Sequence, residues 1–207
     1  MIPAIVLAAG KSTRMGRVKA NLPLEGSETF LSRIVRTFRD ADVDDVVVVV
    51  GHERDAIVEV FLQTELAARF VANPDYESGQ LSSLLAGLRV VDRPGIVAAL
   101  VTLVDVPLVS SVTVRAVVDR YLQTHAPIVR PVRGEQHGHP VLIDRSLFEA
   151  IRRADPTSGA KAVVRAHAST AGDVEVDDEG AFLDIDTLDQ YQRLLGRVPG
   201  GNAVQRK

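Results

Sequence analysis

The sequence of 207 residues predicts an α/β protein, with a mostly parallel central sheet that carries helices on both faces. Strand and helix patterns alternate roughly four times before residue 125, which is typical of parallel sheets with helical crossovers. Three of the predicted strands, at 2–8, 45–50 and 95–104, are nearly continuous apolar runs, as expected for strands buried on both sides. No linker or low-complexity segment interrupts the pattern. Residues 1–195 are therefore expected to form one domain, and 196–207 a disordered tail.

The first part of the chain contains four predicted strands and four predicted helices. The run Asp45–Val50 is β-branched at every position after Asp45 and ends at Gly51, whereas Glu28–Arg39 places its apolar residues on one helical face. Ser110 is the expected N-cap of the fourth helix. Strands are expected at 2–8, 45–50, 69–72 and 95–104, and helices at 28–39, 55–63, 81–91 and 111–124.

The pattern changes after residue 125, where the segments become shorter. Two strands, at 128–133 and 140–143, flank a polar segment that contains two glycines. The turn sequence DDEG predicts a hairpin between 173–177 and 181–184. Helices are expected at 146–154, 160–167 and 188–195.

Composition excludes several classes of function. Apolar residues make up 46% of the chain and charged residues 25%, with a net charge of −3. No general attraction to nucleic acid or to a membrane is therefore expected. The chain has no cysteine, which excludes disulfides, thiolate metal sites and a cysteine nucleophile and suits a cytoplasmic location. The first apolar run lacks a basic flank and predicts a buried strand rather than a signal peptide.

The tetrapeptide GKST at 10–13 raises the question of a P-loop. That motif needs a glycine five residues before the second one, and Ile5 stands there instead. A P-loop lysine also opens a helix directly, whereas no helical pattern begins before about residue 28. A dinucleotide-binding G-x-G-x-x-G fails as well, because position 12 is a serine. Neither motif describes this loop.

What remains is a basic loop that leaves the first strand. Glycine amides and cationic side chains bind phosphate oxygens well. A solvated surface loop of the same charge is the alternative. Its position after a buried strand favours a ligand site, because ligands of such sheets bind at the carboxyl ends of strands. The loop contains Gly10, Lys11, Ser12, Arg14, Gly16, Arg17 and Lys19.

With these motifs assembled, the chain resembles the nucleotidyltransferases of the molybdenum-cofactor type, most closely the cytidylyltransferase branch that acts on molybdopterin. The resemblance covers nearly the whole chain to about residue 195. It implies a three-layer Rossmann-like nucleotidyltransferase fold with a small β-rich insertion on the acceptor side. It rests on LAAGKSTRMGRVK at 7–19, NPDYESGQLSSLLAGL at 73–88, VDVPLV at 104–109, GHPVLIDRSLFEAI at 138–151 and DIDTLDQY at 184–191.

The resemblance implies transfer of a nucleotidyl group from an NTP to a phosphorylated acceptor, with release of pyrophosphate and assistance by Mg²⁺. Arg14, Lys19 and Asp105 would be catalytic. Ala9 stands where the guanylyl branch has a second glycine (LAGG), so its methyl group would shrink the base pocket and favour CTP. The implied nucleotide-binding residues are Leu7, Ala8, Ala9, Gly10, Lys11, Ser12, Arg14, Lys19, Gly79, Ser82, Ser83 and Asp105. Ser82 and Ser83 could equally be ordinary first-turn residues of a helix.

Two carboxylates match the family's metal site, Asp105 and Asp186. Mg²⁺ in proteins takes one or two carboxylates together with phosphate oxygens and water. Asp105 follows a buried strand, at the edge where such a ligand belongs, although a turn or cap role is the alternative. Asp186 could simply cap the last helix, as could Thr187.

Gly138, His139 and Lys161 match the acceptor side of the family. The cytidylyl branch carries G-D-x-G-A-R near 154–161, where this chain has ADPTSGAK, so only Gly159 and Ala160 match cleanly. A sugar phosphate or phospholactate therefore remains open as the acceptor. The pair at His137 and His139 lacks a third ligand at suitable spacing, and no zinc site is expected.

The implied partners are an NTP, a phosphorylated pterin or similar molecule, and a molybdoenzyme that receives the product. Nucleic acid and membrane are not expected as partners. A different class of protein also fits in part: an accessory protein that binds nucleotide or cofactor without turnover. The retained Arg14, Lys19 and Asp105 favour an enzyme, because a pure binder needs no metal carboxylate facing a triphosphate.

Overall fold

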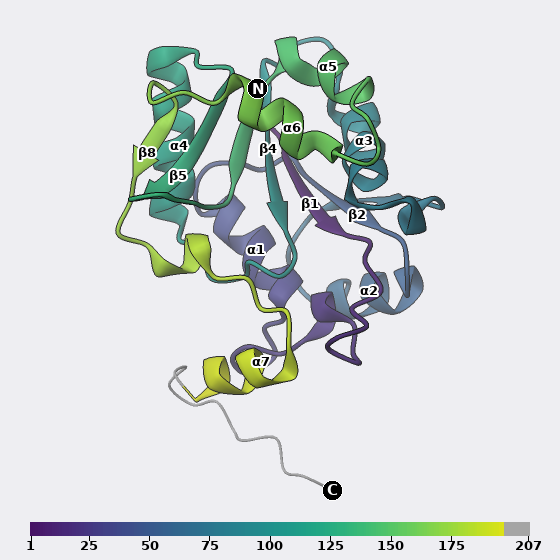
Figure 1. Cartoon of the computed structure of the whole chain (residues 1–207). Helices are drawn as coiled ribbons and strands as arrows, with labels where there is room; N and C mark the ends of the chain where they lie inside the picture. Colours follow the sequence, from purple (N-terminus) through teal and green to yellow (C-terminus); the bar gives the residue numbers. More distant parts are fainter. Residues whose placement is uncertain (197–207) are drawn as a thin grey trace, which may run out of the picture.

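The computed structural model describes residues 1–196, so the predicted tail lies outside the described residues apart from Gly196. A sheet of eight strands forms the middle layer, in the order β3-β2-β1-β4-β7-β5-β6, with β8 paired to β5 (Figure 1). Six strands run in one direction, and only β6 and β7 run opposite to them. The strands are β1 (Ala4–Ala8), β2 (Val46–Val50), β3 (Arg69–Ala72), β4 (Ala98–Leu103), β5 (Ile128–Arg133), β6 (Gln136–His137), β7 (Val141–Asp144) and β8 (Asp173–Glu175).

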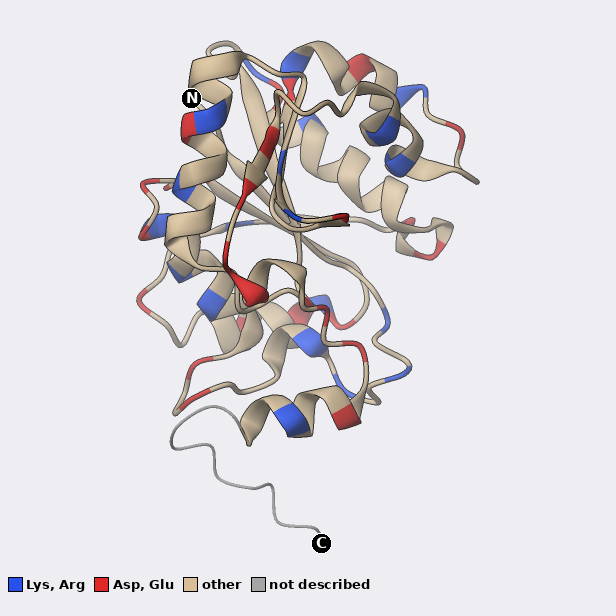
Figure 2. Ribbon diagram, turned by 60° about the vertical axis from the view of Figure 1, so that its left-hand side comes forward, with Lys and Arg blue, Asp and Glu red and all other residues tan. Residues whose placement is uncertain are grey.

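Helices cover both faces of this sheet, which confirms the predicted three-layer α/β fold. On one face α1, α2 and α4 pack against the sheet, and on the other α3, α5 and α6 do so. Charged residues lie mainly on the helices and loops around the sheet (Figure 2). The helices are α1 (Phe30–Arg39), α2 (Arg54–Phe61), α3 (Gln80–Val91), α4 (Ser111–Thr124), α5 (Phe148–Arg152), α6 (Gly159–His167) and α7 (Leu188–Leu195). Within residues 1–196, none of these helices has the length and apolar character that crossing a membrane requires.

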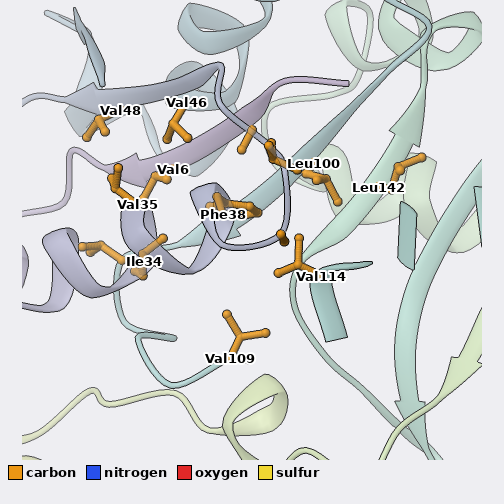
Figure 3. Close-up of a cluster of buried hydrophobic side chains, with 14 of the residues drawn as sticks. Val6, Ile34, Val35, Phe38, Val46, Val48, Leu100, Val109, Val114 and Leu142 are labelled. Carbon is orange, nitrogen blue, oxygen red and sulfur yellow. The ribbon is translucent and has the colours of Figure 1, made fainter. Parts of the chain in front are cut away.

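Successive side chains of β1 point to opposite faces of the sheet and so contribute to two hydrophobic cores, one on each face. Val6 packs with Ile34, Val35 and Phe38 of α1 (Figure 3), whereas Ile5 and Leu7 point to the opposite face. There α3 approaches the sheet closely, because a Cβ on Gly87 would lie 2.6 Å from Cγ2 of Ile5. Burial on both faces explains why β1 is apolar throughout.

Local signals placed several boundaries correctly. Helix α4 begins after Ser110, whose hydroxyl accepts the amide of Thr113, as predicted. Helix α7 begins after Thr187, which forms a capping box with Gln190. The predicted helix at 146–154 is instead a 3₁₀ turn, η3 (Arg145–Leu147), followed by the short α5.

The predicted hairpin around DDEG is wrong. β8 pairs in parallel with β5, and Glu179–Phe182 form a 3₁₀ turn, η4. Asp178 explains the difference, because its carboxylate accepts hydrogen bonds from the amide and hydroxyl of Ser110 at 2.9 and 2.8 Å. A Cβ on Gly180 would lie 2.1 Å from the carbonyl oxygen of Leu108. The turn residues therefore serve tertiary packing. Strands β5, β6 and β8, at one edge of the sheet, form the small β-rich part expected on the acceptor side.

Candidate active site

A cavity of about 330 Å³ lies at the carboxyl ends of β1 and β4, and we call it the loop cavity. Ten of the residues singled out from the sequence line it: Leu7, Ala9, Gly10, Ser12, Arg14, Lys19, Gly79, Ser83, Asp105 and Asp186. Its other lining residues are Thr13, Tyr76, Gln80, Leu103 and Val104. The structure thus brings together the basic loop and both predicted metal carboxylates.

The loop after β1 is held in shape by its own hydrogen bonds. Ser12 has a φ of 51°, and its carbonyl accepts the amides of Met15 and Gly16 at 2.9 and 3.1 Å. Its hydroxyl accepts the amide of Lys19 at 3.3 Å. The Met15 side chain is buried in a small core with Phe30. This anchor leaves the polar side of the loop facing the cavity.

Lys19 is the centre of an ion-pair network across the loop cavity. Its Nζ donates to Oδ2 of Asp105 at 2.9 Å and to Oδ1 of Asp186 at 2.6 Å. Arg14 adds a contact of 3.0 Å to the other oxygen of Asp186. The Lys19 side chain is only 9% exposed, so water screens this network weakly. The Lys19 hydrogen bond and the charges of Lys19 and Arg14 together hold the pKa of Asp186 below its ordinary value, against the effect of burial.

Backbone pairing explains how Asp186 reaches the cavity. The amide of Ile185 donates to the carbonyl of Asp105 at 2.8 Å, which ties the two acidic segments together. Thr187 and Gln190 cap α7, and the Gln190 side chain also accepts the amide of Asp186 at 2.8 Å. Thr187 therefore does the capping, and the carboxylate of Asp186 is left for the cavity.

The two carboxylates suit a hard divalent cation. Both already converge on one cationic group, the Lys19 ammonium. Oδ1 of Asp105 is buried and has no hydrogen-bond partner among residues 1–196. Within that range no group of three or more histidine or acidic side chains could hold a metal. A cation here would take one or two carboxylates and complete its shell with substrate oxygens and water, the usual arrangement for Mg²⁺.

The second wall of the loop cavity comes from the segment between β3 and α3. Asn73 is 4% exposed, and its amide nitrogen donates to the hydroxyls of Ser82 at 2.8 Å and Ser83 at 3.0 Å. Its oxygen accepts the amide of Asp75 at 3.0 Å. Gly79 has a φ of 98°, a conformation that favours glycine, and starts α3. Asn73 therefore fixes this wall.

Three predicted nucleotide-binding residues do not line the loop cavity. The hydroxyl of Ser82 lies within hydrogen-bond distance of the carbonyls of Asp75 and Gly79 and shares its one hydrogen between them, so it holds the turn together. Lys11 is exposed and forms an ion pair with Glu77. Ala8 points to the opposite side of β1, into the core with α1.

A larger cavity of about 840 Å³ adjoins the first, and we call it the α6 cavity. All three predicted acceptor residues, Gly138, His139 and Lys161, line it. Burial lowers the pKa of the His139 imidazole, which favours the neutral form. A Cβ on Gly138 would lie 2.5 Å from the carbonyl oxygen of Ala181, so this glycine permits a close backbone approach.

Leu7, Gln80 and Leu103 line both cavities and mark the boundary between them. Sequence reasoning missed Gln80 and Tyr76, although both lie inside the motif at 73–88. It also missed Arg165, which lines the α6 cavity one helical turn after Lys161. Helical spacing from Lys161 was the signal that could have found it.

Known proteins resemble this chain over most of its length. The MobA-like NTP transferase domain matches residues 4–171. The chain is 31% identical over 206 residues to a protein named nicotine blue oxidoreductase from Paenarthrobacter nicotinovorans, covering 94% of this chain and 96% of that one. It is 28% identical over 192 residues to the molybdenum cofactor cytidylyltransferase of Escherichia coli, covering 92% and 93% of the two chains.

Among solved structures, Rv0371c from Mycobacterium tuberculosis superimposes with a TM-score of 0.77 at 26% identity. The alignment covers 96% of this chain and 100% of that one. A structure of the same protein in complex with manganese gives a TM-score of 0.73 at 27% identity, covering 95% and 99% of the two chains. A related fold has thus been solved with a divalent cation.

Proposed function

Because the chain belongs to the family of MobA-like NTP transferases, we propose that it transfers a cytidylyl group from CTP to molybdopterin or its molybdenum-bound form, with Mg²⁺ and with release of pyrophosphate. The observation that carries this proposal is the position of Ala9 in the loop cavity. The remaining support comes from the ion network and from the adjoining α6 cavity.

Ala9 favours a small base. It is 3% exposed where the loop leaves β1, and its carbonyl accepts the amide of His52 at 3.2 Å. This bond fixes the backbone, so the methyl group cannot easily withdraw. A methyl group at this position leaves less room than a glycine for a purine ring. The resemblance of LAAG to the cytidylyl branch points the same way.

The triphosphate would lie along the basic loop. Backbone amides near Gly10 and the side chains of Arg14 and Lys19 supply the positive groups that phosphate oxygens prefer. Arg14 and Lys19 would exchange their carboxylate partners for phosphate oxygens when the nucleotide binds. Asp105 and Asp186 would then hold Mg²⁺, which supplies charge neutralisation at the phosphates.

The acceptor would occupy the α6 cavity with its phosphate at the boundary between the cavities. An oxygen of that phosphate attacks the α-phosphorus of the nucleotide, and the bond from the α-phosphorus to the leaving pyrophosphate breaks. Such transfer depends mainly on alignment of the reacting atoms and on charge neutralisation. Gln80 lies at this boundary, and the neutral His139 lies in the acceptor part.

The ADPTSGAK segment motivates the alternatives. Pro156 to Lys161 line the α6 cavity, so a departure from the cytidylyl pattern there bears on the acceptor. A sugar phosphate or phospholactate is the second candidate acceptor, and a non-catalytic accessory role is the third. In the proposed function the product passes to a molybdoenzyme, and the cysteine-free chain suits a reducing cytoplasm.

The test is pyrophosphate release by the purified protein with Mg²⁺, molybdopterin and each of CTP, GTP, ATP and UTP. We expect CTP to give the highest kcat/KM, and a preference for GTP would overturn the assignment of the base. Parallel arms replace molybdopterin with a sugar phosphate or phospholactate. The variant Asp105→Asn should lose most of its rate while it keeps measurable nucleotide affinity. A wild type that binds nucleotide but releases no pyrophosphate with any acceptor would favour the accessory role, provided that Asp105→Asn keeps the same nucleotide affinity.

A further inference from the structure

The α6 cavity concentrates positive charge in a chain of net charge −3. Three cationic side chains line it, Arg130, Lys161 and Arg165, and no aspartate or glutamate does. Arg130 is already neutralised, since its Nε lies 2.9 Å from Oδ1 of Asp173. Lys161 and Arg165 form no ion pair with any residue in the described range 1–196. Two positive charges in the wall are therefore left for a ligand.

The two charged side chains are exposed and lie close together on α6. Lys161 and Arg165 are four residues apart on α6, so they lie on one face of the helix, and like charges at this spacing destabilise a helix. The N-terminal end of α6 lies in the same wall, because Gly159 and Ala160 also line the cavity. The Ser158 side chain makes no capping bond there. The partial positive charge of the helix end adds to that of the pair.

Another part of the cavity wall is apolar. Leu81 and Leu84 of α3, Val101 of β4, Ile143 of β7 and Val164 of α6 line it. At about 840 Å³ the cavity is large for a lone phosphate or a small sugar phosphate, which would leave this wall in contact with water. A ligand with an apolar, ring-like body would cover it.

We propose that Lys161 and Arg165 form an anion-binding subsite that selects an acceptor with an apolar ring body and a negative group besides the phosphate that reacts. This inference rests on the proposed function in taking the α6 cavity as the acceptor site. The reacting phosphate belongs at the boundary formed by Leu7, Gln80 and Leu103. Neither Lys161 nor Arg165 lines the loop cavity, so the group that they hold lies further into the α6 cavity.

The direct test uses two fluorescent probes of the same ring system and needs no turnover. 8-Anilinonaphthalene-1-sulfonate carries a sulfonate, and N-phenyl-1-naphthylamine does not. In the double variant Lys161→Gln/Arg165→Gln we expect the dissociation constant of the sulfonate probe to rise about tenfold or more, because two charged contacts are lost. The neutral probe should bind as it does to the wild type. Arg89→Gln/Arg120→Gln removes the same charge from α3 and α4 outside the cavity and is the matched control.

Unchanged binding of the sulfonate probe in the double variant would overturn the subsite. An equal loss of affinity for both probes would also overturn it, since Lys161 and Arg165 would then shape the cavity rather than hold an anion. A wild type that releases no pyrophosphate contradicts the proposed function but leaves the probe result intact. With molybdopterin as acceptor, the double variant should raise the acceptor KM while kcat and the affinity for CTP stay near wild type. A matching fall in kcat would place the pair at the reacting atoms and contradict the proposal.

Discussion

Lys19 and Asp105 lie 86 residues apart in the sequence, yet Nζ of Lys19 is 2.9 Å from Oδ2 of Asp105. The same ammonium lies 2.6 Å from Asp186, so one nearly buried cation holds two carboxylates together. These carboxylates are the proposed metal ligands, and they repel each other. The Lys19 ammonium lowers this repulsion, as a bound metal cation would. Under the proposed function, binding of metal and nucleotide would exchange these ion pairs.

Replacing Lys19 with methionine should reveal this exchange. Asp105 and Asp186 would then lose the cation that bridges them, with only Arg14 left beside Asp186. We expect the free energy of unfolding to fall by about 2 kcal/mol, less than for a fully buried pair because both carboxylates are partly exposed. Mg²⁺ should restore more stability to Lys19→Met than to the wild type. Urea unfolding with and without Mg²⁺ measures both quantities.

Lys11→Met is the matched control for this experiment. It removes the same charge from the same loop, but the Lys11 ion pair with Glu77 is exposed and should matter little. An equal effect of Mg²⁺ on the wild type and on Lys19→Met would contradict the idea that Lys19 competes with the metal.

Ala9→Gly should weaken the preference for CTP over GTP. Removal of one methyl group from the loop cavity enlarges the space for the base, and a methyl group in a specificity pocket is worth about tenfold or more in kcat/KM. Steady-state kinetics with both nucleotides measures the ratio. Ala8→Gly, one residue earlier and pointing to the core with α1, should lower stability without changing the ratio. An unchanged ratio in Ala9→Gly would remove the main support for CTP.

Sequence patterns predicted most of the fold because its signals are local. Apolar runs such as Val46–Val50 and caps such as Ser110 and Thr187 place elements without knowledge of distant contacts. The hairpin around DDEG failed for the opposite reason. Its Asp178 is bound by Ser110, 68 residues away, and the local turn signal carried no information about that contact.

The candidate site was predictable only in part. The basic loop and Asp105 follow buried strands, which is a pattern visible in the sequence. Lys19 and Asp186 are 167 residues apart, and their contact depends on the backbone hydrogen bond by which Ile185 reaches Asp105. Ser82 and Ser83 are neighbours with the same side chain, yet helical geometry turns only Ser83 to the loop cavity.

Asn73→Ala should loosen the wall of the loop cavity. Its buried amide group makes three hydrogen bonds, to Ser82, Ser83 and the amide of Asp75. We expect a loss of about 2 kcal/mol in the free energy of unfolding, because buried polar partners are left unpaired. The KM for the nucleotide should rise, since Gly79 and Ser83 lose their fixed position. Asn21→Ala, which removes a single bond to the carbonyl of Ala56, should leave that KM unchanged.

The pH dependence of stability should identify the Asp186 carboxylate. The Lys19 hydrogen bond and the charges of Lys19 and Arg14 lower its pKa in the folded protein. A lowered folded-state pKa adds stability above the ordinary value of about 3.9, and this contribution disappears as pH falls through the folded-state pKa. We expect Asp186→Asn to be about 1 kcal/mol less stable than the wild type at neutral pH, because a bond to a charged group becomes a neutral one.

The difference between the wild type and Asp186→Asn should shrink below about pH 4, because the asparagine cannot take up a proton. Urea unfolding at a series of pH values between 7 and about 3 follows this difference directly. Asp189→Asn is the matched control. Among residues 1–196 Asp189 forms an ion pair only with the exposed Arg193, at 3.4 Å, so it should show a much smaller pH-dependent difference. A stability difference between the wild type and Asp186→Asn that stays constant over this pH range would contradict the prediction. It would mean that Lys19 and Arg14 do not hold the Asp186 carboxylate ionised in the wild type.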